Sequence, residues 1–131
     1  MPTKKFWMYG FCLHLGLVLV IALSAYLGIL PTHHKAIPFS DFWGHMILIG
    51  MLAFFLDGVF EFRPLLPGKA DWLRLGPIII LTIAAAEEVA QALSPNRTAS
   101  LRDFVADVLG IFICSWLAKR LEARIVRARE V

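Results

Sequence analysis

Charged residues are scarce in this chain. Asp, Glu, Lys and Arg make up 18% of its 131 residues, whereas a soluble domain has about 25%. This shortage, together with 59% hydrophobic residues, argues against a disordered chain, a nucleic-acid-binding protein and an ordinary soluble enzyme. Cysteine is also rare: the chain has only two, from which no disulfide framework can be inferred. The length allows one domain.

The hydrophobic residues are gathered in four long runs. A helix needs about 20 apolar residues to cross a bilayer, with about 17–25 tolerated. The runs show no alternation of apolar and polar residues, which argues against the strands of a membrane barrel. We therefore predict an all-α polytopic membrane protein, in which residues 1–131 form a single bundle of four transmembrane helices. The predicted spans cover about residues 6–30, 42–60, 75–93 and 104–118.

The basic residues predict an orientation, because Lys and Arg accumulate on the cytoplasmic side of a membrane protein. With four spans, most of the 13 basic residues share one side: Lys4, Lys5, Arg63, Lys69, Arg74, Lys119, Arg120, Arg124, Arg127 and Arg129. The other side receives Lys35, Arg97 and Arg102. We expect both termini in the cytoplasm and the protein in a bacterial inner (plasma) membrane. The basic tail, residues 119–131, either continues the fourth helix or lies on the inner leaflet.

Polar residues occur near the predicted outer ends of three consecutive spans. A charged group inside a bilayer costs about 2.5–3.5 kcal/mol on insertion scales, so such residues need a compensating partner. They are Asp41, His45, Glu87, Glu88, Gln91, Asp103 and Asp107. Residues four apart share one face of a helix, which puts His45 with Asp41 and Asp107 with Asp103. We predict that His45, Glu88 and Asp107 gather near the outer surface.

Simpler roles are open for several of these residues. Asp41 can complement the start of a helix, and Asp103 fits a capping box. Either Glu87 or Glu88 can pair with Gln91, and the sequence does not decide which of the two faces the cluster. The whole set can also be a polar network without chemistry, although polar contacts between membrane helices stabilise by only about 0.6 kcal/mol on average.

Small residues recur every four positions in three of the predicted spans. They are Ala106, Gly110, Cys114 and Ala118 in the fourth, Ala86 and Ala90 in the third, and Ser24 and Gly28 in the first. Such stripes allow the backbones of membrane helices to approach closely. We expect these faces to pack against neighbouring helices.

The polar motifs, taken together, resemble those of the VanZ-like family of small bacterial membrane proteins. They are Asp41-x-x-x-His45, Glu88-x-x-Gln91, Pro95-Asn96-Arg97 and Asp103-x-x-x-Asp107-x-x-Gly110. The resemblance covers roughly residues 41–110. Two positions depart from it, because the family usually has Lys at Phe42 and Asn at Asp107. The resemblance implies a polytopic membrane protein associated with resistance to the glycopeptide antibiotic teicoplanin.

Two main functions follow from the resemblance and the polar cluster. The first is a cell-envelope factor whose outward-facing polar site binds an envelope lipid or a glycopeptide, without a nucleic-acid partner. Its candidate binding residues are Asp41, Gln91, Arg97 and Asp103. The second is a membrane-embedded enzyme acting on a lipid-linked envelope substrate, with His45, Glu88 and Asp107 as candidate catalytic residues.

The enzyme hypothesis admits a divalent cation as cofactor. Carboxylate and imidazole groups are suitable ligands, and the candidate set is Asp41, His45, Glu88 and Asp107. No motif identifies a nucleophile. A small multidrug transporter is disfavoured, because such four-helix transporters carry an acid in their first span and this chain has none there.

Overall fold

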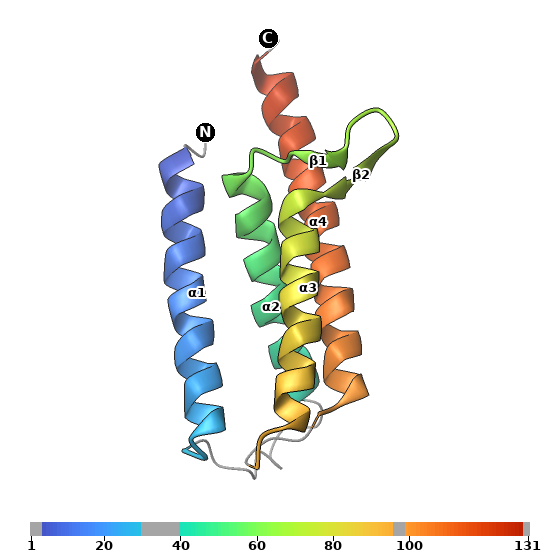
Figure 1. Cartoon of the computed structure of the whole chain (residues 1–131). Helices are drawn as coiled ribbons and strands as arrows, with labels where there is room; N and C mark the ends of the chain where they lie inside the picture. Colours follow the sequence, from blue (N-terminus) through green and yellow to red (C-terminus); the bar gives the residue numbers. More distant parts are fainter. Residues whose placement is uncertain (1–3, 30–39, 96–98, 130–131) are drawn as a thin grey trace.

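The computed structural model describes residues 4–29, 40–95 and 99–129, which form four helices and one hairpin (Figure 1). In chain order these are α1 (Lys4–Tyr26), α2 (Ser40–Val59), β1 (Pro64–Leu66), β2 (Ala70–Arg74), α3 (Leu75–Ala92) and α4 (Leu101–Arg129). The predicted all-α class is confirmed. The short antiparallel pairing of β1 with β2 was not predicted and occupies the connection between α2 and α3.

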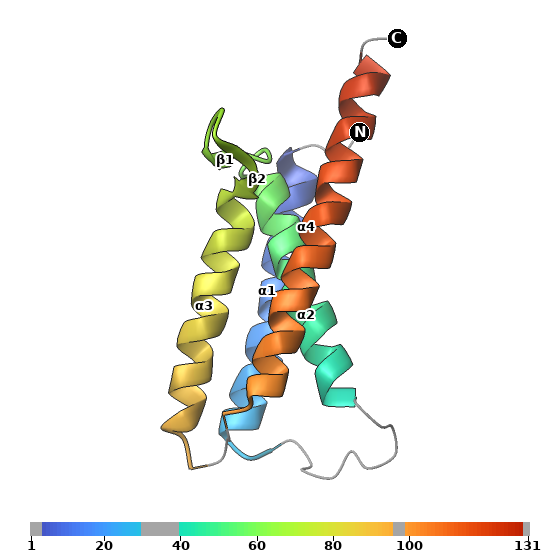
Figure 2. The same cartoon turned by 90° about the vertical axis from the view of Figure 1, so that its right-hand side faces the viewer.

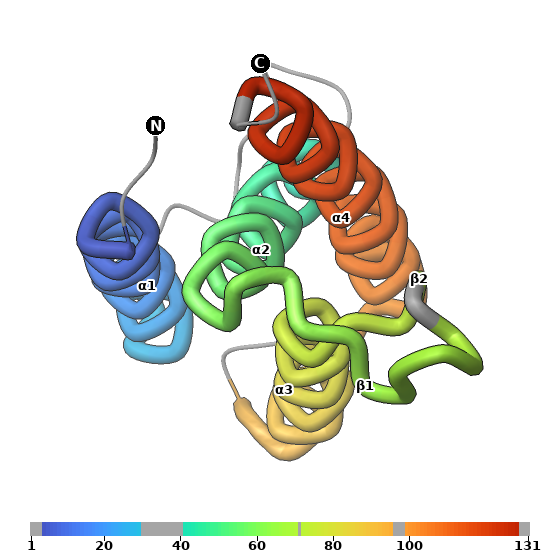
Figure 3. The backbone as a smooth tube through the Cα atoms, turned by 90° about the horizontal axis from the view of Figure 1, so that it is seen from above, coloured from blue at the N-terminus to red at the C-terminus, as the bar shows by residue number. Residues whose placement is uncertain are grey.

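Successive helices run in opposite directions along the bundle (Figure 1). Helix α2 is central, with α1, α3 and α4 packed along it, and α3 also contacts α4 (Figure 3). The two ends of the described chain and the β hairpin lie together at what we call the hairpin end. The last residues of α1 and α3 and the first residues of α2 and α4 lie at the opposite end, which we call the loop end.

Three helices, namely α1, α2 from Asp41 onward, and α3, are long and apolar enough to cross a membrane. Helix α4 is not among them, because acidic and basic residues interrupt its apolar stretch. It is one continuous helix of 29 residues, in which the basic tail continues the helix through Arg129 (Figure 2). At a rise of about 1.5 Å per residue, α4 is longer than the roughly 30 Å hydrocarbon core of a bilayer.

Helix α1 ends at Tyr26, before the predicted end of the first span at residue 30. The cause is Gly28, whose φ of 69° lies in the left-handed region. The N–H of Gly28 donates to the carbonyl of Ala25 at 3.1 Å, and the N–H of Ile29 donates to that of Ser24 at 2.9 Å. This is a Schellman motif, in which glycine satisfies the last carbonyls and stops the helix.

The closest helix contact joins α2 and α4 through small residues. A Cβ added to Gly110 would lie 2.0 Å from the Met46 carbonyl oxygen, and one added to Gly50 would lie 2.7 Å from the Gly110 carbonyl oxygen. Ala106 and Ala118 are fully buried. The predicted packing face of the fourth span is confirmed. The corresponding prediction for α3 is wrong, because Ala86 and Ala90 are exposed.

Helix α1 is attached to α2 at the hairpin end through Trp7, which is 4% exposed. The indole contacts the rings of Phe54 and Phe62, with centroids 5.3 Å and 5.7 Å away. A Cβ on Gly58 would lie 2.2 Å from the indole, so glycine makes room for the ring. The aromatic cluster therefore fixes how α1 lies on α2.

We expect the Gly110→Ala substitution to lower the free energy of unfolding in detergent by about 1–3 kcal/mol, because the added methyl group must push α2 and α4 apart. The matched control is Gly16→Ala, since a Cβ there meets no atom within 4 Å. In the control, higher helix propensity should stabilise by up to about 1 kcal/mol. Equal unfolding curves for the two variants would contradict the close contact.

Candidate functional site

The predicted cluster has its centre where α2 and α4 meet at the loop end. The Nδ1 atom of His45 lies 3.1 Å from Oδ1 of Asp107, and its Nε2 atom lies 4.0 Å from Oδ2 of Asp103. Asp107 is 3% exposed, while His45 and Asp103 are partly exposed. We call these three residues the His45 cluster. One imidazole thus lies between two carboxylates, one buried and one partly exposed.

Glu88 has a different partner. Its carboxylate accepts a hydrogen bond from the backbone N–H of Ser100, directly before α4 begins. The Ser100 hydroxyl in turn accepts the N–H of Asp103 at 3.4 Å, which is the cap that the sequence suggested. Glu88 therefore places a negative charge at the positive end of α4, where the helix dipole stabilises it.

Glu87 and Gln91 form a separate set of contacts with Tyr26 of α1. The Tyr26 hydroxyl at the end of α1 donates to Oε1 of Glu87 at 3.1 Å, and the Gln91 amide donates to Oε2 of the same carboxylate. Gln91 is 1% exposed. Its Oε1 atom is buried and has no hydrogen-bond partner within the described part of the chain. The two adjacent glutamates therefore serve different contacts, Glu87 toward α1 and Glu88 toward α4.

Asp41 and Arg97 were also predicted to lie near this site. Asp41 is exposed at the start of α2, and Arg97 lies outside the described residues. The guanidinium of Arg102 lies 5.8 Å from the centroid of the Phe42 ring, a distance that allows a cation–π contact. The position at which the VanZ-like pattern usually has Lys is thus apolar in this chain, but a positive charge from α4 lies above it.

The candidate metal ligands do not form one group. Within residues 4–29, 40–95 and 99–129, no three His, Cys, Asp or Glu side chains are placed to hold a metal ion. His45 and Asp107 are in contact, whereas Glu88 binds the start of α4 and Asp41 is exposed. What the geometry supports directly is a paired imidazole and carboxylate, able to bind hydrogen-bonding groups or to transfer a proton.

The sequence analysis missed a buried ion-pair network at the hairpin end. Arg74 is 6% exposed, and its Nη1 and Nη2 atoms lie 3.1 Å from Oδ2 of Asp57 and 2.5 Å from Oε2 of Glu122. Its guanidinium also lies 5.3 Å from the centroid of the Phe62 ring. From the sequence, Arg74 was only counted among the basic residues of the predicted cytoplasmic side. The available signal was Asp57, an acid inside an apolar run that required a cation.

Comparisons of the chain with protein-family models, with curated proteins and with solved structures find no match. The His45 cluster, the arrangement of the helices and the motifs of the sequence are therefore the observations that bear on function.

We expect Arg74→Ala to lower the free energy of unfolding by about 3–5 kcal/mol, because it leaves the buried carboxylate of Asp57 without its counter-charge. The control is Arg63→Ala, which removes an exposed arginine from the same connection and should change stability little. The double variant Asp57→Leu with Arg74→Met should recover much of the loss. Unfolding by denaturant in detergent measures all three, and similar losses for Arg74→Ala and Arg63→Ala would refute the network.

Proposed function

We propose that this chain is a four-span bacterial envelope protein, with both termini in the cytoplasm, that binds an envelope lipid or a glycopeptide antibiotic and reduces the antibiotic's action. The observation that carries the proposal is the His45 cluster: an imidazole between two carboxylates, at the end of the bundle opposite the basic tail. The VanZ-like resemblance supplies the connection to teicoplanin resistance.

The distribution of charge supports the orientation. The hairpin end carries Lys4, Lys69 and the basic part of α4, and basic residues favour the cytoplasmic side. In this orientation α4 crosses beside the three apolar helices, since its least polar stretch lies along α2 and its basic extension passes beyond them (Figure 2). The His45 cluster then faces the envelope.

The orientation predicts which cysteine substitutions react with a membrane-impermeant maleimide. In a background with Cys12 and Cys114 replaced by Ser, the Ala99→Cys variant should be labelled in intact spheroplasts. The Lys69→Cys variant should be labelled only after the membrane is permeabilised. Both positions are exposed, so their reactivities differ only by side. Labelling of Lys69→Cys in intact cells would contradict the orientation.

The chemistry of the His45 cluster suits a ligand rich in hydroxyl and amine groups. Carboxylates are hydrogen-bond acceptors only, and an imidazole can donate or accept. Glycan hydroxyls and the amine of a glycopeptide would find an acceptor at Asp103, which is partly exposed. Arg102, beside Phe42, offers a cation to a phosphate or carboxylate on the same ligand. Each of these groups lies at the loop end.

We expect cells producing the wild-type chain to survive more teicoplanin than cells without it, and His45→Ala or Asp107→Leu to abolish this protection, because either change removes the His45–Asp107 contact at the centre of the cluster. The measurement is the minimum inhibitory concentration at matched protein levels. The control is Glu61→Gln, an exposed carboxylate at the hairpin end. A wild-type chain that gives no protection, and when purified binds neither teicoplanin nor envelope lipid, would refute the proposal.

The second candidate function is a membrane enzyme acting on a lipid-linked envelope substrate. The His45–Asp107 contact favours it, since a carboxylate that orients an imidazole prepares it as a general base. The His45→Ala variant distinguishes the two functions. If the His45→Ala variant binds ligand as well as the wild-type chain but gives no protection, the residue is needed after binding, which favours the enzyme.

A further inference from the structure

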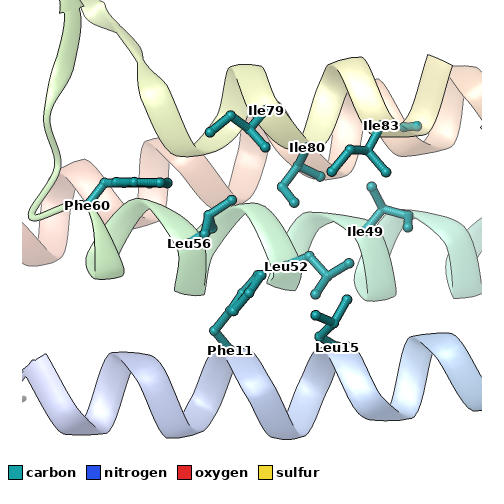
Figure 4. Close-up of a pocket in the computed structure, with 10 residues that line it drawn as sticks. Phe11, Leu15, Ile49, Leu52, Leu56, Phe60, Ile79, Ile80 and Ile83 are labelled. Atoms are coloured by element: carbon teal, nitrogen blue, oxygen red, sulfur yellow. The ribbon is translucent and has the colours of Figure 1, made fainter. Parts of the chain in front are cut away.

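An apolar cavity lies between α1, α2 and α3, away from the His45 cluster (Figure 4). Its volume of about 260 Å³ is several times the roughly 30 Å³ share of a water molecule in the liquid. Its lining is apolar throughout and includes Phe11, Leu15, Leu52, Leu56, Ile80 and Ala84. A site without polar groups does not hold water well, so an apolar occupant is favoured.

The cavity exists because α1 and α3 both pack on α2 but hardly touch one another. Helix α2 forms the floor, and side chains of α1 and α3 form the walls (Figure 4). Ile83, one of the lining residues, is 57% exposed, so the cavity opens to the surroundings of the bundle. Since α1, α2 and α3 are the three helices suited to cross a membrane, those surroundings are lipid chains.

A polar contact closes the loop end of this groove. The hydrogen bond from Tyr26 to Glu87 joins α1 to α3, and Glu87 lies about one turn beyond Ala84 on the same face of α3. Gln91 lies one further turn along that face. Its buried Oε1 atom has no hydrogen-bond partner among the described residues. Along α3 the apolar wall at Ala84 is thus followed by two acceptor groups, in the order that the chain and the head of a lipid would require.

We propose that the cavity holds one hydrocarbon chain of a membrane lipid, and that Gln91 and Glu87 accept hydrogen bonds from hydroxyl groups of its uncharged head. An uncharged head is favoured over a phosphate because the negative carboxylate of Glu87 would repel the negative phosphate. This inference depends on the membrane placement in the proposed function, but not on the role of the His45 cluster.

The test uses the full-length chain in nanodiscs that contain photoreactive lipids. One probe is a diacylglycerol with a diazirine in an acyl chain, and the other is phosphatidylglycerol with the same chain. Peptide mapping should find adducts at Phe11, Leu15 and Ile83 in excess over Phe112, a residue of α4 that is 72% exposed. The diacylglycerol probe should give the greater excess.

Two variants test whether labelling depends on the space inside the cavity: one fills that space and the other leaves it open. Ala84→Leu adds bulk to its wall and should lower the cavity adducts about fivefold, a loss of roughly 1 kcal/mol in binding. Ala85→Leu adds the same bulk at the next, exposed position and should leave them unchanged. Unchanged labelling at Phe112 shows that both variants are folded.

A third variant tests the contact with the lipid head. Gln91→Met should keep the adducts in the cavity and lose the preference for the diacylglycerol probe.

Two results would overturn the proposal. These are cavity adducts no more frequent than those at Phe112, and equal effects of Ala84→Leu and Ala85→Leu. The His45→Ala variant should keep the cavity adducts. A failure of the cavity proposal and a failure of the proposed function therefore give different results.

Discussion

The close approach of α2 and α4 is the constraint on which the rest of the structure depends. At Gly50 and Gly110 the two backbones come so near that neither position has space for a Cβ atom. On one side of this crossing α2 and α4 share the His45–Asp107 contact, and on the other side both reach the guanidinium of Arg74. If the two helices were further apart, each of these polar groups would lie in an apolar environment without its partner, at a cost of several kcal/mol.

The two polar sites differ in their chemical groups. The network around Arg74 joins α2, β2 and α4 and pairs the buried Arg74 and Asp57 with each other, with the ring of Phe62 beside them. Such a network of permanent charges fixes the arrangement of the helices. The His45 cluster contains an imidazole and has a buried member, Asp107, and a partly exposed member, Asp103. A site of that kind can be held in place from within and still reach a molecule from outside.

The helices could be predicted from the sequence because long apolar runs have few alternatives in a bilayer. The meeting of His45 with Asp107 was also predictable, since both lie near the same end of neighbouring spans. The ion pairs of Arg74 were not predicted, because its partner Glu122 lies in a basic tail and is 48 positions away. The partner of Glu88 could not be foreseen either, since a backbone N–H gives no signal in the sequence. A pattern of residue types encodes neither a contact between residues far apart in the chain nor a hydrogen bond donated by a backbone N–H.

The peripheral place of α1 has a consequence for biogenesis. Chains are made from the N-terminus, so α1 enters the membrane before α2, the helix on which it packs, has been synthesised. The crossing of α2 with α4 must wait for the last helix, and until then Asp57 and His45 have only part of their final surroundings. A nascent chain that stops before Asp107 therefore leaves His45 without its buried carboxylate partner, whereas Asp57 already has its counter-charge in Arg74.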